Sequence, residues 1–358
     1  MKWSRGIVLC LAVSACDATD DALYRSVPSD VGPVLQRVAP LSDVERLSLE
    51  RVWEVGPESW ADPTKVSIDD ERVAVVDPQS LRVHLFDAAS GAPLSVFGRR
   101  GEGPGEWRRV SDAVLVGGRV AVSRSAVEGL VLHDLTGAEE GTLDFGIRSP
   151  EVLGGPGERV LATSMMRPSI ALVGDDIAEF ELPASTYPES EFGPCSEFAP
   201  SLEGFVRLRC TAGRMEFHDA TGALVRRTEW PQDPEEASSR QLDDFIDRFW
   251  DAQRGDRERG PLVDRQLDAL AERSRIMPRF SHIRSNRLDG SFLVVEQPFD
   301  GYGGVPATLH RLDTEGRHLG IAETDLLVRD AAMHGDRVAL LIVDPATGLV
   351  SLVVARLT

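Results

Sequence analysis

The sequence predicts an all-β fold, a six-bladed β-propeller, from three observations. First, a unit of alternating strand, Asp, two or three further residues, Gly and a second strand recurs along the chain. Second, the units follow one another at about 40–50 residues, a period typical of a blade of three or four short strands. Third, the last unit lacks one strand, and a segment near the N-terminus can supply it.

The repeat is clearest in four units, whose turns contain Asp87, Asp134, Asp219 and Asp313. Asp accepts backbone N–H bonds and Gly takes positive φ, so the pattern predicts tight hairpins. A weaker unit begins at residue 159 and a final one at residue 337, which makes six units in all. The competing architecture, a pair of β-sandwiches, predicts no fixed period.

The predicted propeller domain covers residues 48–358. Within it, residues 49–56 ("LERVWEVG") alternate in character and precede the first full unit. We expect this strand to pair with the last blade, because that pairing closes the ring and removes its free edges.

A helical insert is predicted at residues 233–276, after the fourth blade. Its start carries Asp and Pro at positions 233 and 234, which are typical of a helix N-terminus. Apolar residues then follow at helical spacing and predict a face that docks on the propeller: Leu242, Phe245, Ile246, Phe249 and Trp250.

The N-terminus reads as an export signal over residues 1–15, with a basic start and an apolar run too short to span a bilayer. The sequence "VSAC" at 13–16 resembles a lipobox, which makes Cys16 the predicted lipidation site. An ordinary secretory signal, cleaved elsewhere, is the alternative. Residues 16–47 are polar with three prolines and predict a tether. The protein is therefore expected to be lipid-anchored in a bacterial cell envelope.

The charge balance limits the partners of the protein. The chain has 58 acidic and 39 basic residues, a formal net charge of −19. Such a surface repels nucleic acid and anionic lipid headgroups, so no nucleic-acid partner is expected, and the membrane is reached only through the lipid. Beyond the signal, Lys65 is the only lysine. A monomer is expected.

Two cysteines remain beyond the predicted lipidation site, Cys195 and Cys210. In an exported chain, this pair predicts a disulfide; two buried thiols are the alternative. A bridge closing so short a loop would contribute about 3 kcal/mol to the free energy of unfolding.

The stretch "VAVVDPQSLRVHLFDAASGAPLSVFGRRGEGPGEW" at 73–107, together with the lipobox and the insert before "PRFSHIRSNRLDGSFLVV", resembles the six-bladed NHL-like β-propeller lipoproteins of bacteria. The resemblance covers most of the mature chain and is weak in blades three and four. It implies the propeller fold and export, and little about function.

The corner "FGRRGEGPGEW" at 97–107 has glycines but no helix start after it, so it does not predict a phosphate-binding loop. We interpret it as a blade junction in which Glu106 pairs with Arg99 or Arg100 and Trp107 locks neighbouring blades. The four long loops, at 99–109, 183–199, the insert and 296–307, are expected on one face. The candidate ligand-binding residues are Arg99, Arg100, Glu106, Trp107, Arg167, Trp230, Phe299, Asp300 and Tyr302.

No motif of a metalloprotease, a redox CxxC or a nucleophile elbow is present, and no catalytic residue, metal site or cofactor is predicted. The first functional hypothesis is a non-catalytic binding or scaffold protein that recognises a protein, peptide or glycan on its loop-rich face. The alternative is a Ca²⁺-dependent, lactonase-like hydrolase or lyase, which rests on architecture alone. Asn286 is the only Asn, and the lactonases use Asn with carboxylates, so its scarcity weighs against the alternative.

Overall fold

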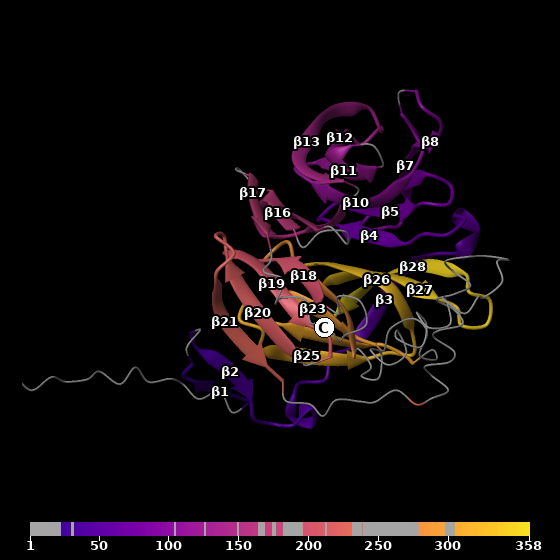
Figure 1. Cartoon of the computed structure of the whole chain (residues 1–358). Helices are drawn as coiled ribbons and strands as arrows, with labels where there is room; N and C mark the ends of the chain where they lie inside the picture. The colour runs from indigo at the N-terminus through magenta and orange to yellow at the C-terminus, as the bar shows by residue number, and fades with distance from the viewer. Residues whose placement is uncertain are drawn as a thin grey trace, which may run out of the picture.

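The structure is a computed structural model (Figure 1). It describes residues 23–29, 32–103, 105–124, 127–148, 150–163, 169–173, 177–181, 196–211, 213–230, 238, 279–297 and 305–358. The regular structure in these residues is β-strand, apart from three short 3₁₀ turns at Leu41–Asp43, Pro57–Ser59 and Pro156–Glu158. The all-β class and the propeller architecture are confirmed.

The described strands form five four-stranded sheets, one six-stranded sheet and a two-stranded ribbon. The first two four-stranded sheets contain β4 (Lys65–Ile68), β5 (Arg72–Asp77), β6 (Arg82–Asp87) and β7 (Pro93–Phe97), then β10 (Val110–Val116), β11 (Arg119–Arg124), β12 (Glu128–His133) and β13 (Glu139–Arg148). The third contains β14 (Glu151–Gly154), β15 (Val160–Thr163), β16 (Ser169–Val173) and β17 (Ile177–Glu181).

The six-stranded sheet contains β18 (Ser196–Pro200), β19 (Gly204–Arg209), β20 (Arg214–Asp219) and β21 (Leu224–Glu229), followed by β2 (Val34–Arg37) and β1 (Tyr24–Val27). The next contains β22 (Phe280–Ser285), β23 (Phe292–Glu296), β24 (Thr308–Leu312) and β25 (His318–Glu323). The last contains β26 (Leu327–His334), β27 (Arg337–Val343), β28 (Val350–Leu357) and β3 (Leu49–Val55), and the ribbon pairs β8 (Arg99–Arg100) with β9 (Glu106–Trp107).

The innermost strands surround one axis. Strand β4 contacts β10 and β26, β14 contacts β10 and β18, and β22 contacts β18 and β26. The inner strands β4, β10, β14, β18, β22 and β26 thus follow one another around a closed cycle. The sheets radiate outward from them, as Figure 1 shows.

The hydrophobic core lies between neighbouring sheets rather than in one central layer. One cluster joins β5 to β10 and β11 through Val76, Leu115 and Val122, and another joins β20 to β23 through Phe217 and Val294. A strand that packs on both sides has no solvent face, which explains uninterrupted apolar runs such as "VAVV" at 73–76.

The predicted closing strand is confirmed. Strand β3 pairs antiparallel with β28, with Glu54 opposite Val353 and Leu49 opposite Leu357. Strand β3 therefore covers the free edge of β28, although it lies about 300 residues earlier in the sequence.

The predicted tether is wrong for residues 23–47. Strands β1 and β2 form a hairpin, and β2 extends the β21 edge in parallel, with Leu35 opposite Thr228. Farther along, Leu47 donates its backbone N–H to the carbonyl of Ile321 at 2.8 Å. Buried apolar side chains hold the segment down, among them Tyr24, Leu35 and Val44. The apolar residues of this segment are scattered through a polar stretch and follow no period. The sequence therefore did not predict that the segment packs on the propeller.

The helical insert at 233–276 lies outside the described residues, apart from Ser238, and stays a prediction. Cys195 also lies outside them, while Cys210 is buried in the core, so the disulfide stays a prediction. Among the described residues, no helix is both long and apolar enough to span a bilayer.

Candidate functional site

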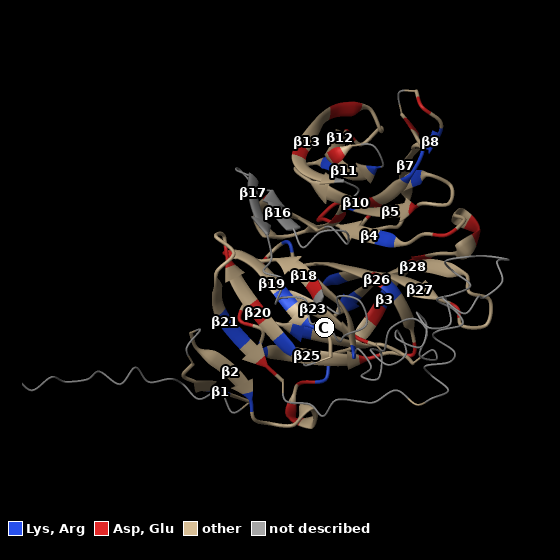
Figure 2. Cartoon of the chain, viewed as in Figure 1, with Lys and Arg blue, Asp and Glu red and all other residues tan. Residues whose placement is uncertain are grey.

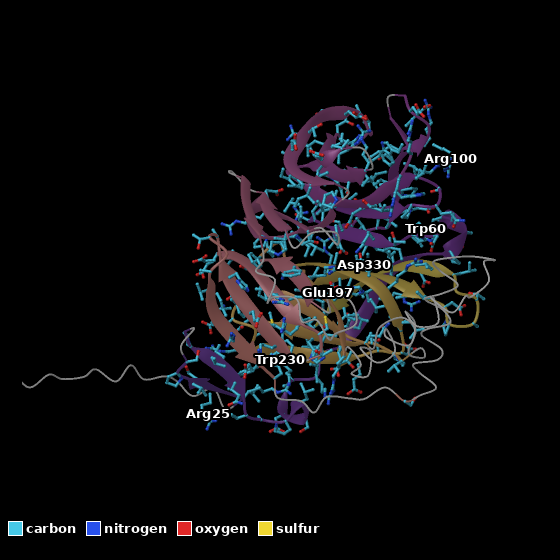
Figure 3. The ribbon with its side chains drawn as sticks, in the orientation of Figure 1. Arg25, Trp60, Arg100, Glu197, Trp230 and Asp330 are labelled. Atoms are coloured by element: carbon cyan, nitrogen blue, oxygen red, sulfur yellow. The ribbon has the colours of Figure 1, made fainter. Side chains whose placement is uncertain are left out.

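Each inner strand contributes one charged side chain to a connected polar group at the axis of the propeller. We call this group the axial ring. Figure 3 labels two of its members, which lie close together at the centre of the molecule. Its six residues are Lys65, Asp112, Glu151, Glu197, Arg284 and Asp330.

Three β-bulges help to place these side chains. The register shifts between Val110 and Asp112 in β10, between Phe280 and His282 in β22, and between Val328 and Asp330 in β26. A bulge inserts a residue and re-aims the side chains that follow it. Asp112 and Asp330, which follow two of these bulges, are both buried at the axis.

Arg284 is the best-satisfied member of the axial ring. Its guanidinium is ion-paired with Asp330, donates to the carbonyl of Ala331 at 3.0 Å, and has Nη1 3.5 Å from a carboxylate oxygen of Glu197. Burial opposes ionisation of Asp330, but the nearby cations, Arg284 foremost and then Lys65, together with the Val66 N–H outweigh burial and lower the Asp330 pKa. Asp330 also accepts the Val66 N–H at 2.8 Å, which ties two neighbouring sheets together.

Lys65 is ion-paired with Glu151. Burial alone would lower the Lys65 pKa, but the carboxylates of Glu151, Asp330 and Asp112 raise it above the ordinary lysine value. Lys65 is therefore a permanent cation and is not available as a neutral amine nucleophile.

Asp112 differs from the other carboxylates of the ring. It accepts backbone N–H groups from Val152 at 2.9 Å and Ala113 at 2.8 Å, and no cation among the described residues lies within 4.0 Å of it. Because it is fully buried, its pKa rises to about 7, although Lys65 partly opposes the rise. Asp112 is thus a carboxyl group able to gain or lose a proton near neutral pH.

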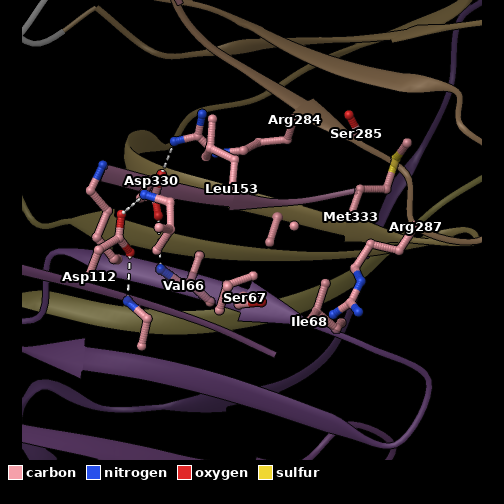
Figure 4. Close-up of a pocket in the computed structure, with 16 residues that line it drawn as sticks. Val66, Ser67, Ile68, Asp112, Leu153, Arg284, Ser285, Arg287, Asp330 and Met333 are labelled. Atoms are coloured by element: carbon pink, nitrogen blue, oxygen red, sulfur yellow. Dashed lines mark hydrogen bonds and ion pairs between the residues drawn. The ribbon is translucent and has the colours of Figure 1, made fainter. Parts of the chain in front are cut away.

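A cavity of about 30 Å³ lies beside the ring, large enough for about two water molecules. Figure 4 shows Asp112, Asp330 and Arg284 at one end and Arg287 and Met333 at the other. Arg287 crosses to the opposite sheets and donates to the carbonyl of Leu115 at 2.5 Å, with Nη2 3.3 Å from Glu158. The remaining walls combine apolar side chains, Ile68, Val114, Val152 and Ala332 among them, with Ser67 and Ser285.

The ring offers one hydrogen-bond acceptor that can change its charge near neutral pH. The two cations of the ring are already paired with carboxylates, and Asp112 alone offers a charge-capable acceptor without a cationic partner. Within the described part of the chain, no three His, Cys, Asp or Glu side chains are grouped so that they could hold a metal ion.

Of the candidate ligand-binding residues predicted from the sequence, the structure describes Arg99, Arg100, Glu106, Trp107 and Trp230. Arg99 and Arg100 are exposed on β8, and Arg100 lies far from the axis in Figure 3. The predicted ion pair within the corner is present, with Arg99 Nε 3.0 Å from Glu106. Arg167, Phe299, Asp300 and Tyr302 lie outside the described residues.

The two predicted tryptophans are core residues. Trp107 is 2% exposed and packs against Phe97 and His133, with ring centroids 6.0 and 5.8 Å away. Trp230 is 1% exposed and packs against Phe280 at 5.5 Å. Both fill the space between neighbouring sheets, as the blade-junction interpretation of Trp107 expects, and neither side chain is available to a ligand.

The sequence reasoning missed the axial ring. One signal was present: Lys65 is the only lysine beyond the signal, in a chain whose other basic residues are arginines. The only Asn of the chain also has a defined contact. Buried Asn286 donates to the Gly335 carbonyl at 3.1 Å and accepts the Gly335 N–H at 2.8 Å. Neither residue belongs to a motif, so only the closed ring reveals their positions.

No protein-family model matches the chain, and no curated protein matches it. Among solved structures, a protein of Bacteroides fragilis thought to be exported has a TM-score of 0.51 at 10% identity, covering 91% of this chain and 99% of that one. Virginiamycin B lyase from Staphylococcus aureus has a TM-score of 0.44 at 14% identity, covering 82% of each chain. Regucalcin, a calcium-binding protein of Agrobacterium tumefaciens, has a TM-score of 0.44 at 14% identity, covering 88% and 95%. At these identities the likeness concerns the fold alone.

Proposed function

We propose that the protein is a non-catalytic binding protein of the cell envelope, and that its ligand, a protein, peptide or glycan, contacts the axial ring. The observation that carries the proposal is the axial ring, in which charged side chains from every inner strand meet beside a cavity. Three of the six members, Asp112, Arg284 and Asp330, are buried, which is costly for charged groups and is not required by packing alone.

The chemistry of the ring favours a ligand that donates hydrogen bonds. The members of the ring that are not buried, Lys65, Glu151 and Glu197, have side chains 23%, 35% and 26% exposed, and the ring carries four carboxyl groups against two permanent cations. An ammonium or guanidinium group of a peptide, or the hydroxyl groups of a glycan, would complement it. The net charge of −19 would attract the cationic ligands in particular.

The binding test uses the full chain with Cys16→Ser, screened against peptide and glycan arrays, with hits titrated by calorimetry. Lys65→Met alters the ring, and Arg119→Met serves as the matched control, because Arg119 pairs with Glu140 on the outer part of its sheet. The proposal expects at least a tenfold loss of affinity in Lys65→Met and none in Arg119→Met. Equal affinities in both variants would place recognition elsewhere.

The second candidate is the Ca²⁺-dependent, lactonase-like hydrolase or lyase. The observation in its favour is that three carboxylates, Asp112, Glu151 and Asp330, gather around Lys65 in the axial ring. Against it, Lys65 and Arg284 already neutralise two of them, and a divalent cation would have to displace these partners. A Ca²⁺-dependent rise in melting temperature together with lactone turnover would favour this candidate.

We also infer six blades, counting the inner four strands of the six-stranded sheet as one blade and β1–β2 as an added hairpin.

The proposal further includes export through residues 1–15, a lipid on Cys16 and a monomeric state. These rest on the N-terminal sequence pattern and on the excess of acidic residues; Figure 2 shows Asp and Glu on several sheets, with Lys and Arg among them. Palmitate labelling of the wild-type chain, lost in Cys16→Ser, tests the anchor.

A further inference from the structure

The N-terminal hairpin, β1 and β2, is attached to the propeller at two places. Strand β2 extends the edge of β21, as described above. On the neighbouring strand, the Tyr24 side chain enters the space between β21 and β25, where its ring stacks on His318 with centroids 6.3 Å apart. Tyr24 is only 3% exposed, so the hairpin docks through a buried polar group.

Tyr24 is the first member of a continuous chain of hydrogen bonds. Its hydroxyl lies 2.5 Å from His318 Nδ1 and accepts the His318 backbone N–H at 3.0 Å. His318 Nε2 lies 3.1 Å from His310 Nδ1, and His310 Nε2 lies 2.7 Å from a carboxylate oxygen of Glu296. Arg279 pairs with the other Glu296 oxygen and ends the chain.

Proton counting defines one satisfied state. Three hydrogen bonds link the four side chains of the chain from Tyr24 to Glu296, and each needs one proton. Neutral Tyr24, His318 and His310 supply three protons. The ionised Glu296 accepts the His310 proton, so each imidazole donates toward Glu296 and Tyr24 donates to His318. A fourth proton, on either imidazole, leaves one N–H or O–H of the chain without an acceptor.

The surroundings of His318 do not compensate a positive charge. The ring centroid of Trp230 lies 5.1 Å from that of His318. The neighbouring His310 is only 1% exposed, so water does not reach the pair from that side. Burial is the main cause that lowers the His318 pKa to about 2, and the nearby His310 and the Arg37 guanidinium on β2 lower it further. The Asp313 charge adds to burial in raising the pKa of Tyr24. The carboxylate of Glu296 is already engaged by His310 and Arg279.

We infer that this hydrogen-bond chain is an acid-sensitive latch, which holds the N-terminal hairpin on the propeller at neutral pH and releases it as the pH falls. Release exposes His318 to water, where the imidazole takes a proton at its ordinary pKa of 6.5. The docked pKa is lower than the released pKa, so protons favour the released state. The docking equilibrium does not depend on pH above about pH 6.5 and weakens by up to about tenfold for each pH unit below it.

The latch changes the length of chain between the predicted anchor and the propeller. With the hairpin docked, about eight residues separate Cys16 from Tyr24, a span of at most roughly 28 Å. With it released, the next buried anchor is Val44, about 28 residues from Cys16, which allows roughly 98 Å. Acid would therefore lengthen the tether, and the latch itself does not depend on the lipid or on the proposed ligand.

Hydrogen–deuterium exchange tests the latch on the full chain with Cys16→Ser, from pH 7.5 to 4.5, with rates corrected for the intrinsic pH dependence. Amides of β1 and β2 are compared with those of β28, an internal control in the closing sheet. The latch predicts that hairpin opening rises at least thirtyfold (about tenfold for each pH unit below 6.5) while β28 stays protected. Hairpin amides that stay protected at pH 4.5, or that open together with β28, would overturn the inference.

Two variants keep the test decisive. In His310→Gln/His318→Gln, carboxamides reproduce one donor and one acceptor at each position but do not titrate, so hairpin opening should become independent of pH. Tyr24→Phe removes the hydroxyl and strands His318 Nδ1, which should raise opening about tenfold at pH 7.5. If the double variant kept the wild-type pH dependence, or Tyr24→Phe opened no more than wild type, the latch would be assigned to the wrong groups.

Discussion

Asp112 is the residue at which burial and charge conflict most directly. Two backbone N–H groups hold its oxygens, but neither carries a formal charge, and Lys65 is committed to Glu151. The raised pKa of about 7 means that the folded protein prefers the protonated carboxyl. Such perturbed groups concentrate at functional sites, which is one reason to place the ligand here.

This pKa predicts how stability changes with pH. A carboxyl group whose folded pKa lies above its unfolded value stabilises the fold at low pH, and that stabilisation is lost as the pH rises from 3.8 to about 7. Asp112→Asn removes the ionisation. The free energy of unfolding of Asp112→Asn minus that of wild type should therefore be higher at pH 8 than at pH 5 by roughly 2–3 kcal/mol, which means that the variant is relatively more stable at pH 8.

Denaturant unfolding at both pH values measures this difference. Asp325→Asn, a carboxylate outside the axial ring, is the control and should show no such change between the two pH values. If Asp112→Asn behaved like Asp325→Asn, the assignment of the raised pKa to Asp112 would fail.

Two glycines of the corner at 97–107 separate backbone strain from crowding. Gly98 has φ +88°, and an added Cβ would lie 2.3 Å from the Trp107 ring and 2.7 Å from the Leu81 carbonyl oxygen. Gly105 has φ +69° and no heavy atom within 4 Å of an added Cβ. Both substitutions strain the backbone, and only the first displaces a buried tryptophan.

We therefore predict that Gly105→Val costs about 1–2 kcal/mol from strain alone and that Gly98→Ala costs at least about 3 kcal/mol. Thermal melting of Gly98→Ala beside Gly105→Ala gives the matched comparison. Equal losses would mean that Trp107 can move away and does not lock the junction.

At the scale of the element, strand β3 shows what sequence periodicity can predict. Its alternation and its position before the first unit predicted that it completes the last sheet, where it pairs with β28. The same reasoning failed for β1 and β2, which have four residues each and depend on a few distant side chains, such as His318, for their position. Short strands held by tertiary contacts carry too little local pattern to be recognised.

Removal of β3 tests the closure. A chain that begins at residue 48 keeps β3, and one that begins at residue 57 lacks it and leaves β28 as an open edge. The shorter chain should melt at a lower temperature and form concentration-dependent aggregates in light scattering. Two monomeric chains with equal melting temperatures would show that the closing strand contributes little.

At the scale of the whole molecule, the repeat was sufficient to predict the architecture, but the candidate site was not predictable. Lys65 and Glu151 lie 86 positions apart, and Arg284 and Asp330 lie 46 apart, in units that resemble one another only in their turns. Their meeting depends on how the inner strands circle the axis and on three bulges that alternation does not reveal. The loop residues proposed from the sequence were chosen by residue type, and closure of the ring places the charged residues elsewhere.

The net charge of −19 predicts a kinetic effect. A cationic peptide that binds at the ring should associate more slowly as salt screens the long-range attraction. Stopped-flow measurements at 20 and 300 mM NaCl should show at least about a tenfold fall in the association rate constant, with a smaller change in dissociation. An association rate indifferent to salt would point to a neutral ligand, such as a glycan.

The central claim is that ligand recognition occurs at the axial ring, and Lys65 offers a direct measurement of it. In the full chain with Lys2→Arg and Cys16→Ser, Lys65 is the only lysine, so ¹³Cε-lysine labelling gives a single NMR resonance from the centre of the propeller. We predict that this resonance shifts as a peptide or glycan hit is titrated, in proportion to the saturation measured by calorimetry. A Lys65 resonance that stayed unchanged at full saturation would contradict the account.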